Sequence, residues 1–147
     1  MKIALGTDHG GFCLKAAIID YLEKKGIEYK DFGTFSTDSV DYPDIAFPVA
    51  LAVAKGEFDK GILLCGTGIG MAITANKVKG VRAAVLSDEF SAKATAEHNN
   101  TNVLAMGGRI VSPEQAVHLA DLWLTTPFAG GRHQQRLDKI KAIEDNN

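Results

Sequence analysis

The chain lacks the features that would assign it to a membrane, to the secretory pathway or to nucleic acid. Its two cysteines, Cys13 and Cys65, lie far apart and form no C-x-x-C pair, so we expect no disulfide framework. No apolar run approaches the roughly 20 residues that a membrane helix needs, and no basic segment followed by an apolar one opens the chain. A net charge of only −2 argues against a dedicated nucleic-acid binder. These absences predict a cytoplasmic protein with reduced thiols that binds neither a membrane nor nucleic acid.

The sequence also lacks metal-binding spacings and has few prolines. The four histidines and two cysteines show no spacing typical of a metal site, so we expect no metal. There are only four prolines, whereas the 15 glycines exceed the ordinary usage of about 7% and gather in short clusters. The 147 residues, 46% of them apolar, are enough for one domain with its own core. We predict a single domain over residues 1–147, of which residues 130–147 form a C-terminal tail helix.

Short apolar runs alternate with helical patterns along the chain. Strands and helices in alternation predict a doubly wound parallel sheet, that is, a Rossmann-like three-layer αβα sandwich of the α/β class. The five predicted strands are Lys2–Gly6, Ile27–Phe32, Gly61–Cys65, Val81–Leu86 and Thr101–Met106.

Local signals predict where several helices begin. Residues 33–44 are polar and predict a loop, after which Pro48 is expected in the first turn of a helix, because proline has no N–H for an interior hydrogen bond. Residues 71–77 predict a short helix. The segment Ser112-Pro113-Glu114-Gln115 combines a cap residue, proline at the first helical position and glutamine two residues later. The last helix is expected from Arg132 to about Glu144.

The carboxyl ends of the predicted strands mark the expected ligand site. Doubly wound sheets bind ligands outside the carboxyl ends of their strands. Four places meet that rule: Asp8-His9, Cys65–Gly70, Asp88 and Gly107–Arg109.

The glycine-rich loop Cys65–Gly70 admits three chemistries. A dinucleotide fingerprint lacks its third glycine, because Met71 or Ile73 stands there, although Asp88 lies where a ribose-binding acid would. A cysteine phosphatase would need arginine in place of Met71. The third chemistry is a cysteine at a helix N-terminus, with backbone amides aimed at a developing oxyanion. The alternative is a strand-end cysteine that is merely buried.

Arginines gather in the C-terminal tail. Arg132 and Arg136 lie four residues apart, on one helix face, where two guanidiniums suit a phosphate or carboxylate. Arg109 is a third candidate. In a chain of net charge −2, three such arginines indicate one small anionic ligand. The alternative is a solvated basic face.

The histidines divide by position. His9 at a strand end is a candidate ligand or acid–base group, and His98 at a helix end is either functional or a cap near the helix dipole. His118 falls on a polar helix position. His133 adjoins the arginines but is expected to point about 100° away from Arg132, so we assign it no role.

These residues together resemble the type B ribose-5-phosphate isomerase family, which includes galactose-6-phosphate isomerase subunits. The resemblance covers essentially the whole chain, in order. The matching segments are Thr7–Phe12, Asp41–Pro43, Cys65–Gly70, Ala75–Lys77, Glu97–Asn99, Asn102–Leu104 and Gly130–Arg136.

The resemblance implies an aldose–ketose isomerase that needs neither metal nor cofactor. Ribose 5-phosphate and ribulose 5-phosphate would interconvert through a cis-enediolate, with Cys65 as the base. Some family members use a glutamate at the position of Met71 instead, so this chain resembles the cysteine branch. Thr67 and the amides of Gly66–Gly70 would stabilise the enediolate oxygen, and His98 would assist opening of the furanose ring.

The resemblance also implies substrate contacts and a partner. Asp8, Tyr42 and Asn99 would contact the sugar, and the phosphate would be held by His9, Arg109, Arg132 and Arg136. The family forms homodimers with sites shared between subunits, so the tail helix is expected to extend to a dimer partner. Two other functions stay open: isomerisation of a six-carbon phosphosugar (allose or galactose 6-phosphate), and a non-catalytic module that binds a nucleotide or phosphosugar.

Overall fold

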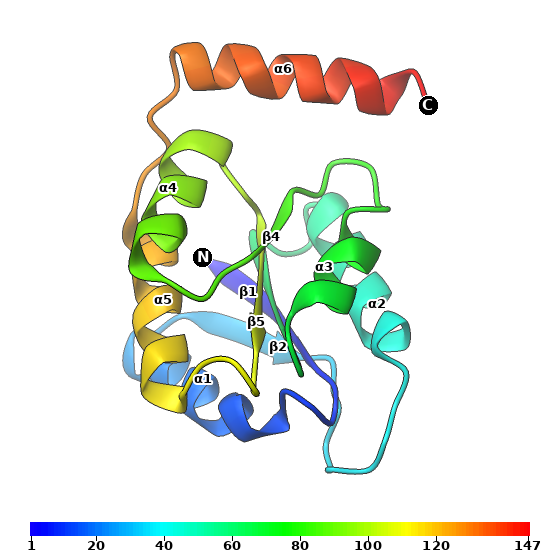
Figure 1. Ribbon diagram of the computed structural model, residues 1–147, viewed down its shortest axis with the longest axis vertical. Helices are drawn as coiled ribbons and strands as arrows, with labels where there is room; N and C mark the ends of the chain where they lie inside the picture. The colour runs from blue at the N-terminus through cyan, green and yellow to red at the C-terminus, as the bar shows by residue number, and fades with distance from the viewer.

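A five-stranded parallel sheet forms the centre of the molecule in the computed structural model, which describes residues 1–147 (Figure 1). All four strand pairings are parallel, and the spatial order is β2-β1-β3-β5-β4. The strands are β1 (Lys2–Thr7), β2 (Glu28–Asp31), β3 (Lys60–Cys65), β4 (Ala83–Val85) and β5 (Val103–Gly107). The predicted α/β class and its five-stranded parallel sheet are confirmed.

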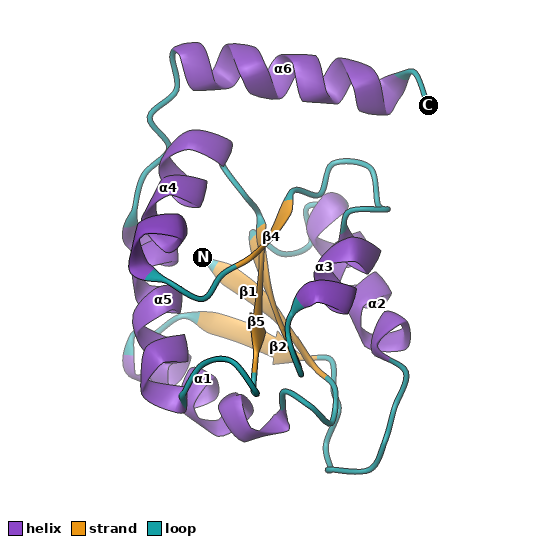
Figure 2. Cartoon of the chain, viewed as in Figure 1, coloured by secondary structure: helices purple, strands orange, loops and turns teal.

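Six helices accompany the sheet, and five of them cover its two faces (Figures 1 and 2). Helices α1, α4 and α5 pack on one face, while α2 and α3 pack on the other. Helix α6 lies outside both layers, across one end of the sheet. The helices are α1 (Phe12–Lys24), α2 (Tyr42–Ala54), α3 (Ile69–Ala75), α4 (Glu89–Asn99), α5 (Pro113–Thr125) and α6 (Arg132–Asp145).

The central strands are buried on both sides, which explains their continuous apolar runs. In β3, Ile62 and Leu64 join the core beneath α1, α4 and α5, whereas Leu63 and Cys65 join the core beneath α2 and α3. Successive side chains of a strand point to opposite faces, so a strand covered on both sides needs apolar residues at every position. The same face rule places the Cys65 side chain on the α2–α3 side.

Helix caps follow the predicted signals at α5. The Ser112 hydroxyl accepts a hydrogen bond from the Gln115 amide at 3.2 Å, and the Gln115 side chain accepts one from the Ser112 amide at 2.9 Å. This reciprocal pair is a capping box with Pro113 in the first turn. Asp88 caps α4 by accepting from the Ser91 amide at 2.8 Å, and that contact lowers the pKa of Asp88.

The position expected for Pro48 was wrong. Helix α2 begins at Tyr42, inside the segment expected to be a loop, so Pro43 occupies its first turn and Pro48 lies in its interior. Pro48 therefore has no N–H to donate to the Asp44 carbonyl. Its side chain is exposed, so water can satisfy the freed carbonyl. Helix α3 also begins earlier than expected, at Ile69, and ends at Ala75.

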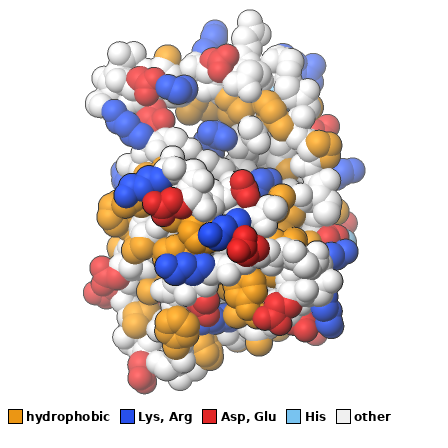
Figure 3. Space-filling view, turned by 180° about the vertical axis from the view of Figure 1, so that it is seen from behind, with side chains coloured by type: hydrophobic (Ala, Val, Ile, Leu, Met, Phe, Trp, Pro, Cys, Tyr) orange, Lys and Arg blue, Asp and Glu red, His pale blue; other side chains and the backbone are white.

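No helix of the structure combines the length and the apolar character that a membrane crossing requires. On the face seen in Figure 3, acidic and basic side chains are interspersed, with apolar side chains between them.

Candidate active site

Three loops meet at the carboxyl edge of the sheet. Strand β1 pairs with β3, and β3 pairs with β5, so the residues that follow these strands lie side by side. The Asp8 amide donates to the Leu64 carbonyl at 2.9 Å, and the Gly108 amide donates to the Cys65 carbonyl at 2.8 Å. The chain turns to opposite sides after β1 and after β3, which makes this edge the topological switch point where such folds bind ligands.

Glycine is required where these loops touch through their backbones. A Cβ at Gly107 would lie 2.5 Å from the Thr67 Cα, and one at Gly10 would lie 2.8 Å from the Gly66 nitrogen. Any larger residue would separate the loops, so part of the glycine surplus is explained by this close packing. The packing brings the loops after β1, β3 and β5 into one site.

Asp8 is fixed at the base of this edge. Its side chain is buried, and its Oδ1 accepts hydrogen bonds from the Gly10 amide at 2.8 Å and the Gly11 amide at 3.1 Å. These bonds hold the turn between β1 and α1 and orient the carboxylate. Asp8 therefore has a fixed position from which its other oxygen can contact a ligand.

Cys65 ends β3 with its sulfur held by the following loop. The side chain is buried, and the Gly68 amide donates to Sγ at 2.9 Å. Gly68 adopts a φ of +85°, a left-handed conformation that favours glycine and that turns its N–H back toward the sulfur. Negative charge on the sulfur would strengthen this bond. A base or nucleophile at this position is thus held in a defined orientation.

Thr67 and Tyr42 complete the same wall. The Thr67 hydroxyl accepts from the Ile69 amide at 3.2 Å. The Tyr42 ring lies against Gly70, where an added Cβ would come within 2.6 Å of its atoms Cε1 and Cζ. The ring sits at the start of α2, so the unexpected early start of that helix is what positions it.

The loop between β2 and α2 reaches His9. The Val40 amide donates to His9 Nδ1 at 3.2 Å, so Nε2 is the ring nitrogen that this bond leaves available to a ligand. The other end of the loop is anchored by the buried Lys15, whose Nζ contacts Asp31 Oδ2 at 2.6 Å and the Thr34 carbonyl at 2.5 Å. The guanidinium of Arg109 lies beside Gly66, because a Cβ there would be 3.7 Å from Arg109 Nε. His9 and Arg109 thus supply polar and positive groups next to Cys65.

His98, Asn99, Arg132 and Arg136 lie elsewhere, at the opposite edge of the sheet (Figure 1). Helix α4 runs back along the sheet and ends at Asn99, just before the first residue of β5, whereas Cys65 pairs with Gly107 at the last residue of β5. Arg132 and Arg136 lie on α6, across this second edge (Figure 2). One chain therefore does not bring Cys65 and His98 together.

The second edge has its own organisation. Arg82 donates to the Asn100 carbonyl at 2.7 Å and to the Asn99 carbonyl at 3.3 Å, which ties the end of α4 to β4. The His98 and His133 rings stack with centroids 4.4 Å apart and planes 14° apart. Burial first, and then the neighbouring His98, Arg132 and Arg136, lower the pKa of His133. Our expectation that His133 has no role rested on its direction relative to Arg132, and no pattern in the sequence indicated the contact with His98.

The remaining candidates have structural partners. His118 lies 2.6 Å from Glu89 on the surface, and Asp88 caps α4. Both cysteines are free thiols. No group of three or more histidine, cysteine, aspartate or glutamate side chains is arranged to hold a metal ion.

Comparison with known proteins places the chain among the sugar isomerases. The sequence model described as Ribose/Galactose Isomerase matches residues 3–140. A ribose-5-phosphate isomerase B of Escherichia coli is 53% identical over 97% of this chain and 96% of that protein. The chain belongs to the ribose/galactose isomerase family.

Solved structures agree with this assignment. A ribose-5-phosphate isomerase B of Clostridium thermocellum superposes with a TM-score of 0.97 at 51% identity, over 99% of each chain. A ribose-5-phosphate isomerase B of Mycoplasma genitalium with bound ribulose-5-phosphate superposes with a TM-score of 0.95 at 42% identity, over 99% of this chain and 97% of that one.

Proposed function

We propose that this chain interconverts ribose 5-phosphate and ribulose 5-phosphate, with Cys65 as the base. The observation that carries the proposal is the placement of Cys65, a buried thiol at the topological switch point. Its sulfur accepts a hydrogen bond from the Gly68 amide, and the carboxylate of Asp8 is held by hydrogen bonds in the adjacent loop. The Escherichia coli relative and the two structural relatives named for this activity support the substrate.

The reaction moves one proton between two neighbouring carbons. Cys65 removes the proton from C2 of the open-chain aldose, and the carbonyl oxygen at C1 takes up negative charge. The proton of the C2 hydroxyl then passes to the C1 oxygen, and the Cys65 thiol returns its proton to C1 as the C2 carbonyl of the ketose forms. The carbon acid is weak, so the base must be close and the developing oxyanion must meet donors that are already in place. The cis-enediolate is the intermediate that such donors would stabilise.

The loop amides divide between two tasks. The Gly68 amide is occupied by the Cys65 sulfur and the Ile69 amide by the Thr67 hydroxyl. The amides of Gly66, Thr67 and Gly70 donate to no acceptor within the chain. We assign the enediolate oxygen to these three free donors, together with the Thr67 hydroxyl. Seven-residue α3 is too short for its dipole to matter as much as these direct bonds.

The catalytic site is shared between two chains in this proposal. Asp8, His9 and Cys65 lie at the carboxyl edge, while His98, Asn99 and the tail arginines lie at the opposite edge. A two-fold symmetric dimer that sets the second edge of one chain against the first edge of its partner would form two identical sites. His98 would then assist ring opening, and Arg132 and Arg136 would join His9 and Arg109 around the phosphate.

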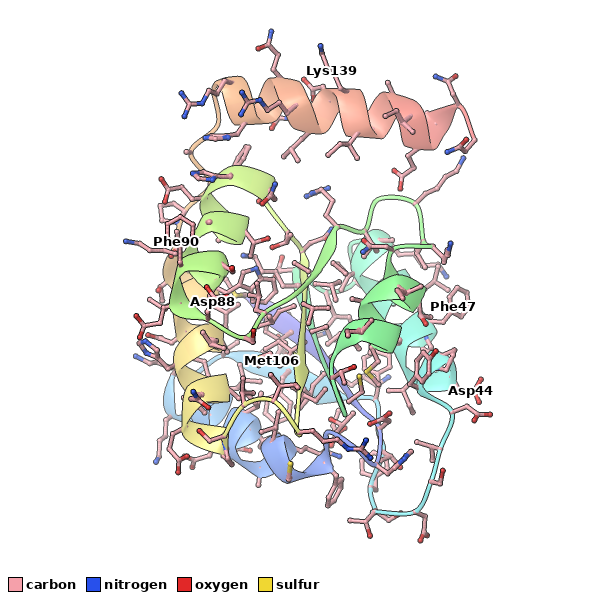
Figure 4. All side chains as sticks on the ribbon, in the orientation of Figure 1. Asp44, Phe47, Asp88, Phe90, Met106 and Lys139 are labelled. Carbon is pink, nitrogen blue, oxygen red and sulfur yellow. The ribbon has the colours of Figure 1, made fainter.

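An exposed apolar surface supports such an interface. Tyr42, Phe47, Ile69 and Ile73 are each between 42% and 58% exposed, and they lie on the packed pair α2 and α3, next to the Cys65 loop. Figure 4 shows Phe47 projecting outward from α2. Large exposed apolar patches on a protein surface mark protein–protein contacts, and we assign these four side chains to such a contact.

The substitution of Cys65 tests the proposal. Cys65→Ala should abolish formation of ribulose 5-phosphate while calorimetry still detects binding of ribose 5-phosphate, because the phosphate contacts remain. Cys13→Ala is the matched control, since that thiol is exposed and its hydrogen bond is to the Gly108 carbonyl, at 3.7 Å. Full activity in Cys65→Ala would contradict the assignment of the base.

A six-carbon phosphosugar is the second candidate substrate, because the matching family is described by both ribose and galactose. Comparison of kcat/KM for ribose 5-phosphate, allose 6-phosphate and galactose 6-phosphate decides between them. Binding of a nucleotide or phosphosugar with no turnover of any of these sugars would instead indicate a non-catalytic module.

A further inference from the structure

His133 lies face to face with His98 at the second edge of the sheet. The ring centroids are 4.4 Å apart and the planes differ by 14°. His98 comes from the last turn of α4 and His133 from the first turn of α6, so the contact joins two separate elements. The His98 side chain is otherwise exposed, and no hydrogen bond within the chain restrains its ring.

The turn before α6 sets this contact. The Ala129 amide donates to the Glu97 carbonyl at 3.0 Å, which docks the approach to α6 on the end of α4. Gly130 and Gly131 then adopt φ values of +66° and +57°, so the chain reverses sharply before the helix. The His133 amide donates to the Gly130 carbonyl at 3.1 Å and closes the first turn. This backbone path places the His133 ring against the His98 ring.

We infer that His133 is a positioning residue for His98, an inference that rests on the proposed function. A stacked ring restricts rotation of the His98 side chain, which would otherwise sample several rotamers in water. Stacking covers one face of the imidazole and leaves both nitrogens at its rim. The rim is where His98 must meet the ring oxygen and the anomeric hydroxyl of a furanose in order to open it.

The contact also sets the spacing between two parts of the site. His133 is flanked by Arg132 and is three residues from Arg136, so the stack fixes the proposed phosphate-binding turn relative to the ring-opening histidine. A phosphosugar held by the arginines would then present its furanose ring to His98 at a constant distance. Accurate placement of this kind raises the rate of the catalysed step, because a displacement of about 1 Å can slow a reaction roughly 100-fold.

The charges around His133 agree with a neutral ring. Burial first, and then the neighbouring His98, Arg132 and Arg136, lower the pKa of His133, and Glu97 is the one acidic group that raises it. Two protonated imidazoles in contact would repel each other and both arginines. A His133 that stays neutral can stack on His98 through the catalytic cycle.

Three substitutions of His133 test the inference. His133→Ala and His133→Gln remove the ring, whereas His133→Phe keeps a flat ring that can stack but cannot donate to phosphate. His118→Ala is the matched control, because that histidine contacts Glu89 on the surface, at the opposite end of α4 from His98. Thermal melting and sedimentation are measured first, to check that each variant folds and assembles like the parent.

Two readouts separate ring opening from proton transfer. One is kcat and KM on ribose 5-phosphate, which is mostly a furanose. The other is exchange of the C1 hydrogen of ribulose 5-phosphate with D2O, which needs the base and the phosphate contacts but no ring opening. We expect His133→Ala and His133→Gln to lower kcat about tenfold, a fraction of what removing a general acid or base does, with exchange changed less than about twofold. His133→Phe should retain most of the parental kcat.

The opposite outcomes overturn the inference. Unchanged kcat in His133→Ala and His133→Gln would show that His98 needs no stacked ring. An increase in KM of the same size in all three variants would show that His133 itself binds the phosphate. If the parent protein shows neither turnover nor exchange, the proposed function fails, and that result is distinct from a failure of the positioning role.

Discussion

A dimer built from two differently damaged chains should recover activity that neither chain has alone. The first damaged chain carries Cys65→Ala, at the carboxyl edge of the sheet. The second carries Arg132→Ala together with Arg136→Ala, at the opposite edge. The two edges lie at opposite ends of β5, so a shared site takes one edge from each chain.

The expected activity of the mixed dimer follows from its two-fold arrangement of sites. In the mixed dimer, one site combines both defects and the other combines two intact edges, so we expect about half the parental kcat/KM per dimer and an unchanged KM. Each parent variant is far weaker: loss of the base removes roughly 100- to 10,000-fold, and loss of two charged hydrogen bonds of about 1.5–3 kcal/mol each removes a similar factor.

The assay requires mixed dimers free of either homodimer. Two affinity tags on co-expressed chains, followed by purification on both tags, isolate them. A mixture of Cys65→Ala with Asp8→Ala is the control, because both defects lie at the carboxyl edge and every site of that dimer is damaged. If the mixed dimer of the first pair is as inactive as its parents, each chain holds a complete site and the shared arrangement is refuted.

Two further substitutions test local features. Gly70→Ala should keep or slightly raise the melting temperature, because alanine favours a helix by about 0.5–1 kcal/mol, but its Cβ would meet the Tyr42 ring at 2.6 Å and should raise KM several-fold. If the fold-changes in KM of Gly70→Ala and Tyr42→Ala simply multiply in the double variant, the effect of Gly70→Ala on KM does not depend on the Tyr42 ring. Tyr21→Phe should lower the unfolding free energy by about 1 kcal/mol at neutral pH, because it removes the 2.7 Å bond from the Tyr21 hydroxyl to Asp121. Burial first, and then Asp121, raise the pKa of Tyr21, so its contribution is complete below about pH 10 and declines as pH rises further. Urea unfolding at several alkaline pH values should show a steeper decline in the parent than in Tyr21→Phe, and equal slopes would contradict this account.

The carboxyl-edge half of the candidate site could be predicted because its causes are local. Strands β1, β3 and β5 are mostly buried, largely apolar runs that end at recognisable turns, and parallel strands end at a common edge. Asp8, Cys65 and Arg109 therefore converge once the strands are identified. The glycines that let these loops touch are visible as clusters in the sequence, although only the structure shows that Gly107 meets Thr67.

The start of helix α2 was predicted in the wrong place. Pro48 was assigned to a first turn because proline favours helix starts, but Pro43 takes that place and the helix begins at Tyr42. Local signals for this start are present, since Asp41 is the N-cap residue, Pro43 lies in the first turn and Asp44 is its acidic residue, but the polar composition of residues 33–44 favoured a loop.

The sequence by itself determined the alternation of strands and helices, the carboxyl-edge residues and the pair of arginines on one helical turn, because these follow from periodicity, turn residues and spacing. Only the tertiary structure decided that His98 and the tail arginines lie at the other end of β5 from Cys65, and that His133 stacks on His98. Both outcomes depend on the direction in which α4 returns along the sheet and on the path of the Gly130-Gly131 turn. These are contacts between segments distant in sequence, and their free energies are absent from any local pattern.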